Sequence, residues 1–74
     1  MEKTYLVLFE KSNTGYAAHV PDLPTILVTG KTLEETMQRA MEAIGIYKEE
    51  MQALGISLPE PAVIADYLTY REAS

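Results

Sequence analysis

The feature that most constrains this chain is an apolar stripe through the middle of its 74 residues. Apolar side chains recur there at spacings of three and four, at Leu33, Met37, Ala40, Met41, Ile44, Tyr47, Met51 and Leu54. Such spacings place side chains on one face of an α-helix. Thr32 and Glu35 form a capping box at the start, and Gly55 suits a left-handed cap at the end. The sequence therefore predicts a helix of about six turns, with its methionines filling the core.

Three short segments rich in β-branched, aromatic and apolar residues precede this helix. They cover residues 5–9, 16–20 and 26–29. Polar and Gly residues follow the first segment, Pro21 and Pro24 follow the second, and Gly30 follows the third. Because Gly and Pro interrupt strands and favour turns, the pattern predicts three strands, with the two prolines outside the sheet.

A fourth extended segment is expected after the helix. Residues 59–61 (PEP) make a stiff connector, and residues 62–68 follow it with a weak alternation that also allows a short helix. The order predicts an α+β fold, a two-layer βββαβ arrangement in which an antiparallel sheet packs on one long helix. We expect a single domain over residues 1–74, with its core at about 4–68 and a loose tail at 69–74.

The first predicted strand is apolar on both faces. Alternation places Tyr5, Val7 and Phe9 on one face and Leu6 and Leu8 on the other. One helix covers only one face of a sheet, so we expect an exposed apolar patch that binds another protein. Leu6, Leu8 and Ala17 are expected on it, and Leu27 is a further candidate. The alternative is that the C-terminal segment, or the curl of a twisted sheet, covers this patch.

Charge narrows the class of partner. The formal net charge is −5 and six residues are Lys or Arg, which disfavours DNA and RNA because affinity for phosphate backbones comes largely from basic side chains. An acidic domain favours encounter with a basic protein, although modest acidity also serves simply to keep a small domain in solution.

The residue types also bear on location and stability. With no Cys, no signal-peptide pattern and no apolar run of about 20 residues, we expect a cytoplasmic protein without disulfides or membrane spans. Self-association, as a dimer or tetramer, is the expected source of any stability that so small a core lacks.

The residue pattern predicts a binding protein without catalytic residues, metal or other cofactor. His19 is the single histidine and has no Cys or HxxxH companion, whereas a zinc or iron site needs three or four converging ligands. Glu34 and Glu35 are neighbours on the expected helix and point about 100° apart, which suits helix capping better than acid–base chemistry.

The turn at Asp22, Leu23 and Pro24 is a second expected contact region. Nearby prolines make it rigid, and a polar residue beside an exposed apolar side chain is well presented to a partner. The alternative is that the turn only redirects the chain while Asp22 caps its own backbone. The expected partner contacts are therefore Leu6, Leu8, Asp22, Leu23 and Pro24.

Four segments, in this order, carry a resemblance to a known family. They are residues 15–24 (GYAAHVPDLP), 30–35 (GKTLEE), 42–44 (EAI) and 59–61 (PEP). Together, over about residues 4–61, they resemble the N-terminal domain of HicB-type antitoxins. Thr25-Ile26 stands where that family commonly has Gly-Cys, and Thr36 stands where Ala is usual.

The resemblance implies a βββαβ domain, often self-associating, that neutralises a small, basic HicA-type RNA-cleaving toxin by covering its active site. It implies no catalytic role for the domain itself. Longer relatives also carry a DNA-binding domain, but thirteen residues follow Pro61 here, so direct DNA binding is not expected. The alternative, from another class, is a homo-oligomeric module that binds a small ligand or assists assembly without a toxin partner.

Overall fold

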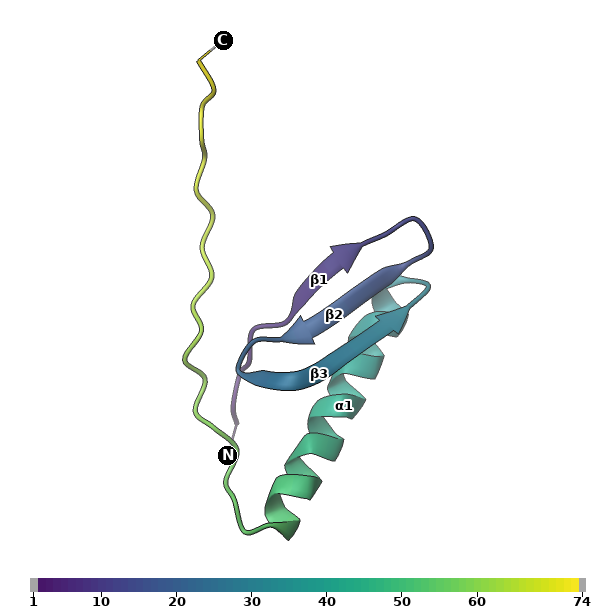
Figure 1. Ribbon diagram of the computed structural model, residues 1–74, viewed down its shortest axis with the longest axis vertical. Helices are drawn as coiled ribbons and strands as arrows, with labels where there is room; N and C mark the ends of the chain where they lie inside the picture. The colour runs from purple at the N-terminus through teal and green to yellow at the C-terminus, as the bar shows by residue number, and fades with distance from the viewer. Residues whose placement is uncertain (1, 74) are drawn as a thin grey trace.

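The computed structural model describes residues 2–73. It contains three strands and one helix, β1 (Leu8–Lys11), β2 (Tyr16–Val20), β3 (Leu23–Gly30) and α1 (Leu33–Ala53). The strands form one antiparallel sheet in the order β1-β2-β3, and α1 packs on one face of it, against β2 and β3 (Figure 1). The predicted α+β fold, with an antiparallel sheet on one long helix, is confirmed.

The core lies between the sheet and the helix. Val20, Leu23 and Ile26 are its buried centre. Partly buried side chains from the N-terminal segment, β3, the helix and the segment after it pack around this centre: Tyr5, Val7, Val28, Ala43, Ile44, Tyr47 and Leu58. Burying one such aliphatic side chain stabilises the fold by about 1.5–3 kcal/mol.

β3 starts earlier than the sequence predicts. It begins at Leu23 and includes Pro24, which was expected to lie outside the sheet. β3 is an edge strand, where a proline can sit without removing a ladder hydrogen bond. The register also shifts: His19 pairs with Leu27, but Val20 pairs with Leu23 where regular pairing would give Ile26. This bulge turns Leu23 inward, against the core.

Two glycines allow close approach at the end of the sheet where α1 begins. Gly15 has a φ of 155°, and a Cβ on it would overlap the carbonyl oxygen of Gly30. A Cβ on Gly30 would lie 2.5 Å from Oγ1 and 2.9 Å from the backbone N of Thr36. Only Gly fits at both positions without displacing its neighbours.

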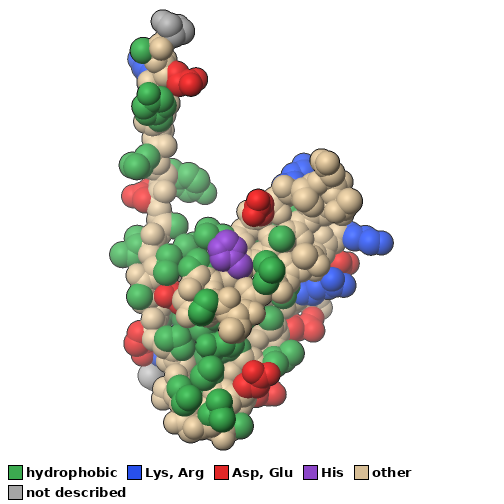
Figure 2. Space-filling model, viewed as in Figure 1, with side chains coloured by type: hydrophobic (Ala, Val, Ile, Leu, Met, Phe, Trp, Pro, Cys, Tyr) green, Lys and Arg blue, Asp and Glu red, His purple; other side chains and the backbone are tan. Residues whose placement is uncertain are grey.

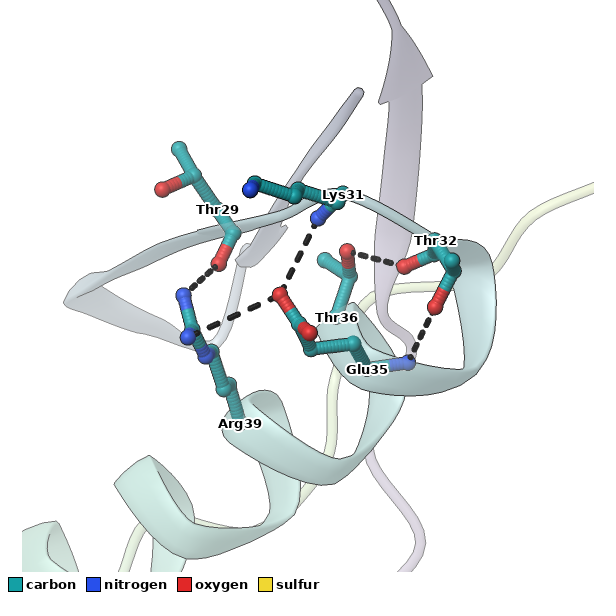
Figure 3. Close-up of polar contacts among 6 residues, drawn as sticks. All are labelled: Thr29, Lys31, Thr32, Glu35, Thr36 and Arg39. Atoms are coloured by element: carbon teal, nitrogen blue, oxygen red, sulfur yellow. Dashed lines mark hydrogen bonds and ion pairs between the residues drawn. The ribbon is translucent and has the colours of Figure 1, made fainter. Parts of the chain in front are cut away.

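The first turn of α1 is fixed by polar contacts that Figure 3 shows. Oγ1 of Thr32 accepts a hydrogen bond from the Glu35 N–H at 3.1 Å, as the capping box predicts. The Glu35 carboxylate, however, accepts from the backbone N–H of Lys31 at 3.1 Å, one residue before the expected donor. Arg39 then joins the helix to the sheet by donating to the Thr29 carbonyl oxygen at 2.8 Å.

The last turn of α1 closes in the Schellman arrangement. Gly55 has a φ of 72°, in the left-handed region. Its N–H donates to the Gln52 carbonyl oxygen at 3.0 Å, and the Ile56 N–H donates to that of Met51 at 2.8 Å. These two bonds satisfy carbonyl groups that the helix itself leaves free, so the predicted left-handed cap at Gly55 is confirmed.

The helix buries less of its apolar stripe than the sequence predicts. Its fully buried residues are Thr36 and Ala40, whose small side chains let the helix approach the sheet closely. Met37 and Met41, expected in the core, are exposed. The physical reason is that α1 lies over β2 and β3, so the flank of the stripe that faces β1 has little sheet to pack on.

The expected fourth strand is not formed. Among the described residues, 56–73 contain neither strand nor helix. The segment is held at its start: the Tyr5 hydroxyl donates to the Pro59 carbonyl oxygen at 2.5 Å, and Lys3 pairs with Glu60 at 2.6 Å. The Asp22 carboxylate then accepts from the N–H groups of Ala62 and Val63, with N to O distances of 3.3 Å. These contacts direct the chain away from its own sheet (Figure 1).

Candidate protein-binding surfaces

One face of the sheet lies opposite the helix and presents apolar side chains. Leu8, His19 and Leu27 are direct neighbours across the three strands, and directly paired residues point to the same face. The next row on that face is Glu10, Ala17 and Thr29. We call these six residues the open sheet face. Figure 2 shows the single histidine, in purple, among hydrophobic side chains on this side of the molecule.

Leu8 and Leu27 supply the exposed apolar area of the open sheet face. Their side chains are 41% and 70% exposed. The predicted exposure of Leu8 is therefore confirmed, whereas Leu6 lies before β1 and is half-buried. The sequence places the first strand at residues 5–9, but β1 starts only at Leu8, so Leu6 is not part of the paired face. Leu27 is the more exposed of the two leucines.

The turn at Asp22 to Pro24 differs from its expectation. Leu23 is 0% exposed, so the premise that it presents an apolar side chain to a partner is wrong. The register shift beside His19 is the cause, because it places Leu23 opposite Val20 in the core. Pro24 is exposed, as expected. Asp22 is half-buried, and its carboxylate already binds the N–H groups of Ala62 and Val63 in its own chain.

A groove of about 900 Å³ lies on the helix side of the molecule, between the N-terminal segment and α1. We call it the helix groove. Its apolar lining comes from Tyr5, Val7, Met41, Ile44, Ile56 and Leu58. Lys3 and Lys48 also line it. The groove exists because α1 lies beside β2 and β3 and leaves the N-terminal segment partly uncovered.

Residues 62–73, which we call the arm, form the third apolar surface. Large apolar side chains of the arm are 84% to 97% exposed: Ile64, Tyr67, Leu68 and Tyr70. Figure 2 shows hydrophobic side chains, in green, along a thin extended chain that stands apart from the rest of the molecule. The sequence predicts a loose tail only from residue 69, so the detachment of residues 64–68 is a finding of the structure.

These surfaces offer apolar contact and charge rather than reactive groups. Within residues 2–73, no three His, Cys, Asp or Glu side chains gather where they could hold a metal ion. In the same range, no helix is long and apolar enough to cross a membrane. The chain as a whole carries a formal charge of −5, and Glu10 places a carboxylate on the open sheet face itself.

Comparison with known proteins identifies a family and a relative. Residues 5–73 match the family described as "HicB_like antitoxin of bacterial toxin-antitoxin system", a range that includes the sheet, the helix and the arm. The chain is also 38% identical over 68 residues to the "Uncharacterized 14.9 kDa protein in rep-hol intergenic region" of Haemophilus phage HP1 (strain HP1c1). That similarity covers 92% of this chain and 51% of the phage protein, so the chain spans about half the length of this relative.

Proposed function

Since the chain belongs to the HicB-like antitoxin family of bacterial toxin–antitoxin systems, we propose that it neutralises a small, basic, HicA-type RNA-cleaving toxin by covering the toxin's active site. Membership of the family agrees with the resemblance found in residues 15–24, 30–35, 42–44 and 59–61. The family supports an antitoxin role. The class of toxin and the mode of inhibition are the proposal.

The open sheet face is the observation that carries the proposal. Exposed apolar side chains that are adjacent in space, unlike single exposed ones, mark surfaces that bind other proteins. Leu8 and Leu27 are brought together with His19 by the pairing of all three strands, so this surface is rigid before a partner arrives. A rigid surface loses little conformational freedom on binding, which favours affinity.

Charge supports a basic partner. A protein that binds RNA presents Lys and Arg to the phosphates. This chain has eleven acidic and six basic residues, so its field attracts such a surface and raises the rate of encounter. Glu10 lies on the same face as the exposed leucines, so its carboxylate can pair with the side chains that the toxin uses to hold RNA.

Inhibition of this kind needs no chemistry from the antitoxin. The domain acts by occupying the surface where RNA would bind, as a non-enzymatic protein in the cytoplasm where both proteins are made. It needs no metal or cofactor for this role. Of the contacts expected from the sequence, Leu8 and Pro24 are exposed and remain in the proposal.

A homo-oligomeric module is the second candidate, and the arm favours it. Four large apolar side chains held in solvent on one extended segment suit contact with a further polypeptide, which another copy of the chain can supply. In this candidate the chain acts by assembly or by binding a small ligand, without a toxin partner.

The test uses two leucines that match in residue type and exposure. Leu27, on the open sheet face, and Leu54, at the end of α1, are each 70% exposed. Leu27→Asp and Leu54→Asp add the same charge and remove the same apolar area. We expect wild-type protein and Leu54→Asp to inhibit RNA cleavage by a purified HicA-type toxin, and Leu27→Asp to lose inhibition by at least about tenfold in half-inhibitory concentration.

Circular dichroism of each variant, measured before the assay, separates loss of binding from loss of folding. Leu54→Asp carries a cost of about 0.3–1 kcal/mol in stability, since a carboxylate near a helix C-terminus opposes the helix dipole. Equal inhibition by all three folded proteins would exclude the open sheet face as the inhibitory surface. Failure of the folded wild-type protein to inhibit or bind that toxin would reject the proposed partner.

A further inference from the structure

We propose that the helix groove binds a single-chain aliphatic carboxylate, such as a medium-chain fatty acid, with the hydrocarbon over Met41 and Ile44 and the carboxylate at Lys48. The site lies between the N-terminal segment and α1. It is separate from the open sheet face, so it does not rest on the toxin proposal. The order of apolar and cationic side chains along the groove carries the inference, together with the charge of the groove.

One wall of the groove is a stripe along α1 that changes from apolar to polar. Met41, Ile44, Lys48 and Gln52 line the groove, and spacings of three and four place them on one face of the helix. At about 1.5 Å per helical residue, the stripe is about 16 Å long. Its first half is apolar, and its second half carries an ammonium group and an amide. This wall therefore suits a molecule that is apolar at one end and polar at the other.

The opposite wall has the same polarity. Lys3 begins this wall and Val7 ends it, directly before β1. Lys3 also pairs with Glu60, in the segment that follows α1, so Lys3 lies toward the end where the helix finishes. β1 leads away from that end (Figure 1). Both walls therefore carry their lysines toward one end of the groove and their aliphatic side chains toward the other.

The charge of the groove is opposite to that of the chain. The chain has eleven acidic residues and a formal charge of −5, but among the described residues that line the groove none is acidic and two are lysines. Lys3 is already paired with Glu60 at 2.6 Å. Lys48 makes no ion pair within residues 2–73, and the positions three and four residues from it along α1 hold no acidic side chain. Its ammonium group is therefore available to the carboxylate of a ligand.

The size and lining of the groove fit one hydrocarbon chain. Its volume of about 900 Å³ lies within the range of about 300–1,000 Å³ that is usual for small-molecule sites, which are mostly apolar with a few polar groups. Met41 is 70% exposed, and its flexible side chain adapts to what packs on it. An anionic membrane is a poorer partner, because it repels a chain of charge −5. The site therefore favours a free carboxylate over a lipid surface.

The first experiment is a chain-length series. Octanoate, decanoate and dodecanoate, each below its micelle concentration, are titrated into the wild-type chain by isothermal calorimetry. We expect one ligand to bind per chain. Each added pair of methylenes should lower the dissociation constant by about 4- to 15-fold, for methylenes that are half or fully buried.

The second experiment tests the role of Lys48 with two variants of equal net charge. Lys48→Glu reverses a charge inside the groove, and Lys11→Glu reverses one at an exposed position of β1 that does not line it. We expect Lys48→Glu to weaken decanoate binding by about three- to tenfold and Lys11→Glu to leave it unchanged. Binding of decanol, which has the same chain without a charge, should be the same in both variants and in the wild type.

The third experiment places the hydrocarbon. Met41, in the groove, and Leu27, on the open sheet face, are each 70% exposed, so an Asp at either position is tolerated by the fold. Circular dichroism checks this for each variant. We expect Met41→Asp to weaken decanoate binding by at least about tenfold and Leu27→Asp to bind it as the wild type does. Since Leu27→Asp is the variant expected to lose toxin inhibition, the two proposals fail separately.

The opposite results overturn the proposal. Folded wild-type protein that does not bind decanoate excludes the site, and equal affinity for all three chain lengths excludes a hydrocarbon site. Equal effects of Lys48→Glu and Lys11→Glu exclude Lys48 as the carboxylate partner. Weaker decanoate binding by Leu27→Asp, with Met41→Asp unaffected, would place the ligand on the open sheet face. Binding to phosphatidylglycerol vesicles without binding to decanoate would replace the free carboxylate with a membrane surface.

Discussion

Replacing Gly30 with Ala is expected to destabilise the domain at the junction between β3 and α1. The added Cβ would lie 2.5 Å from Oγ1 of Thr36, 2.9 Å from its N and 3.2 Å from its Cα. Thr36 is 0% exposed, and its hydroxyl already donates to the Thr32 carbonyl oxygen at 2.7 Å. Two of the three contacts are with backbone atoms of the helix, so the first turn of α1 itself must move.

The size of the effect follows from two opposing terms. Forcing an extra carbon into a packed site costs about 1–3 kcal/mol. Replacing Gly with Ala also restricts the unfolded chain, which returns about 0.4–1 kcal/mol. The net loss is about 1–2 kcal/mol. In a domain of 60–100 residues each kcal/mol shifts the melting temperature by about 4–8 °C, so we expect a fall of about 5–15 °C.

Gly45→Ala provides the matched control for Gly30→Ala. Gly45 is exposed within α1, and a Cβ there meets nothing within 4 Å. The same chemical change should therefore stabilise the protein by about 0.5–1 kcal/mol, since Ala favours helix. Thermal melting followed by circular dichroism measures both variants. A Gly30→Ala melting temperature at or above that of the wild type would show that the junction is not tightly packed.

Three further substitutions test other contacts. Asp22→Ala removes the acceptor of the Ala62 and Val63 N–H groups, so hydrogen exchange at these amides should become faster while that of β2 is unchanged; equal protection would contradict the contact. Thr32→Ala removes the N-cap of α1 and should cost about 0.5–2 kcal/mol in urea unfolding, and an unchanged midpoint would count against the cap. Gly55→Ala should cost about 1–2 kcal/mol because of its φ of 72°, with Gly55→Asn less affected; a smaller loss for Ala than for Asn would contradict the left-handed cap.

The helix and its two ends could be predicted because their signals are local. The capping contact joins Thr32 to Glu35, and the closing bonds at Gly55 involve residues within one turn. Side chains this close in sequence meet in almost any fold that contains the helix. The turn at Gly15 could be predicted for the same reason, because polar and Gly residues lie between the first two predicted strands.

Burial at the β2–β3 turn could not be predicted, because it depends on register. Leu23 is buried because a register shift pairs it with Val20. The alternation of apolar and polar residues in the sequence does not reveal how many residues a β-bulge contains. The exposure of Met37 and Met41 has a similar origin. Their spacing predicts a helix face correctly, but which part of the face meets the sheet depends on how the helix lies over β2 and β3.

The position of the arm depends on contacts between distant parts of the chain. Asp22 and Ala62 are separated by 40 positions, and Tyr5 and Pro59 by 54. Residues 62–68 have the composition of a strand, and the sequence therefore predicts one. The strand needs an available edge, however, and these long-range contacts direct the segment away from the sheet.

The proposed binding of a toxin at the open sheet face is tested most directly by methyl NMR of the labelled protein as a HicA-type toxin is added. We expect the methyl signals of Leu8 and Leu27 to shift or broaden in proportion to bound toxin. Those of Ile46, exposed on α1, and Leu54, at its C-cap, should keep their positions. Changes confined to the helix, with Leu8 and Leu27 unaffected, would contradict the assignment of this face as the inhibitory surface.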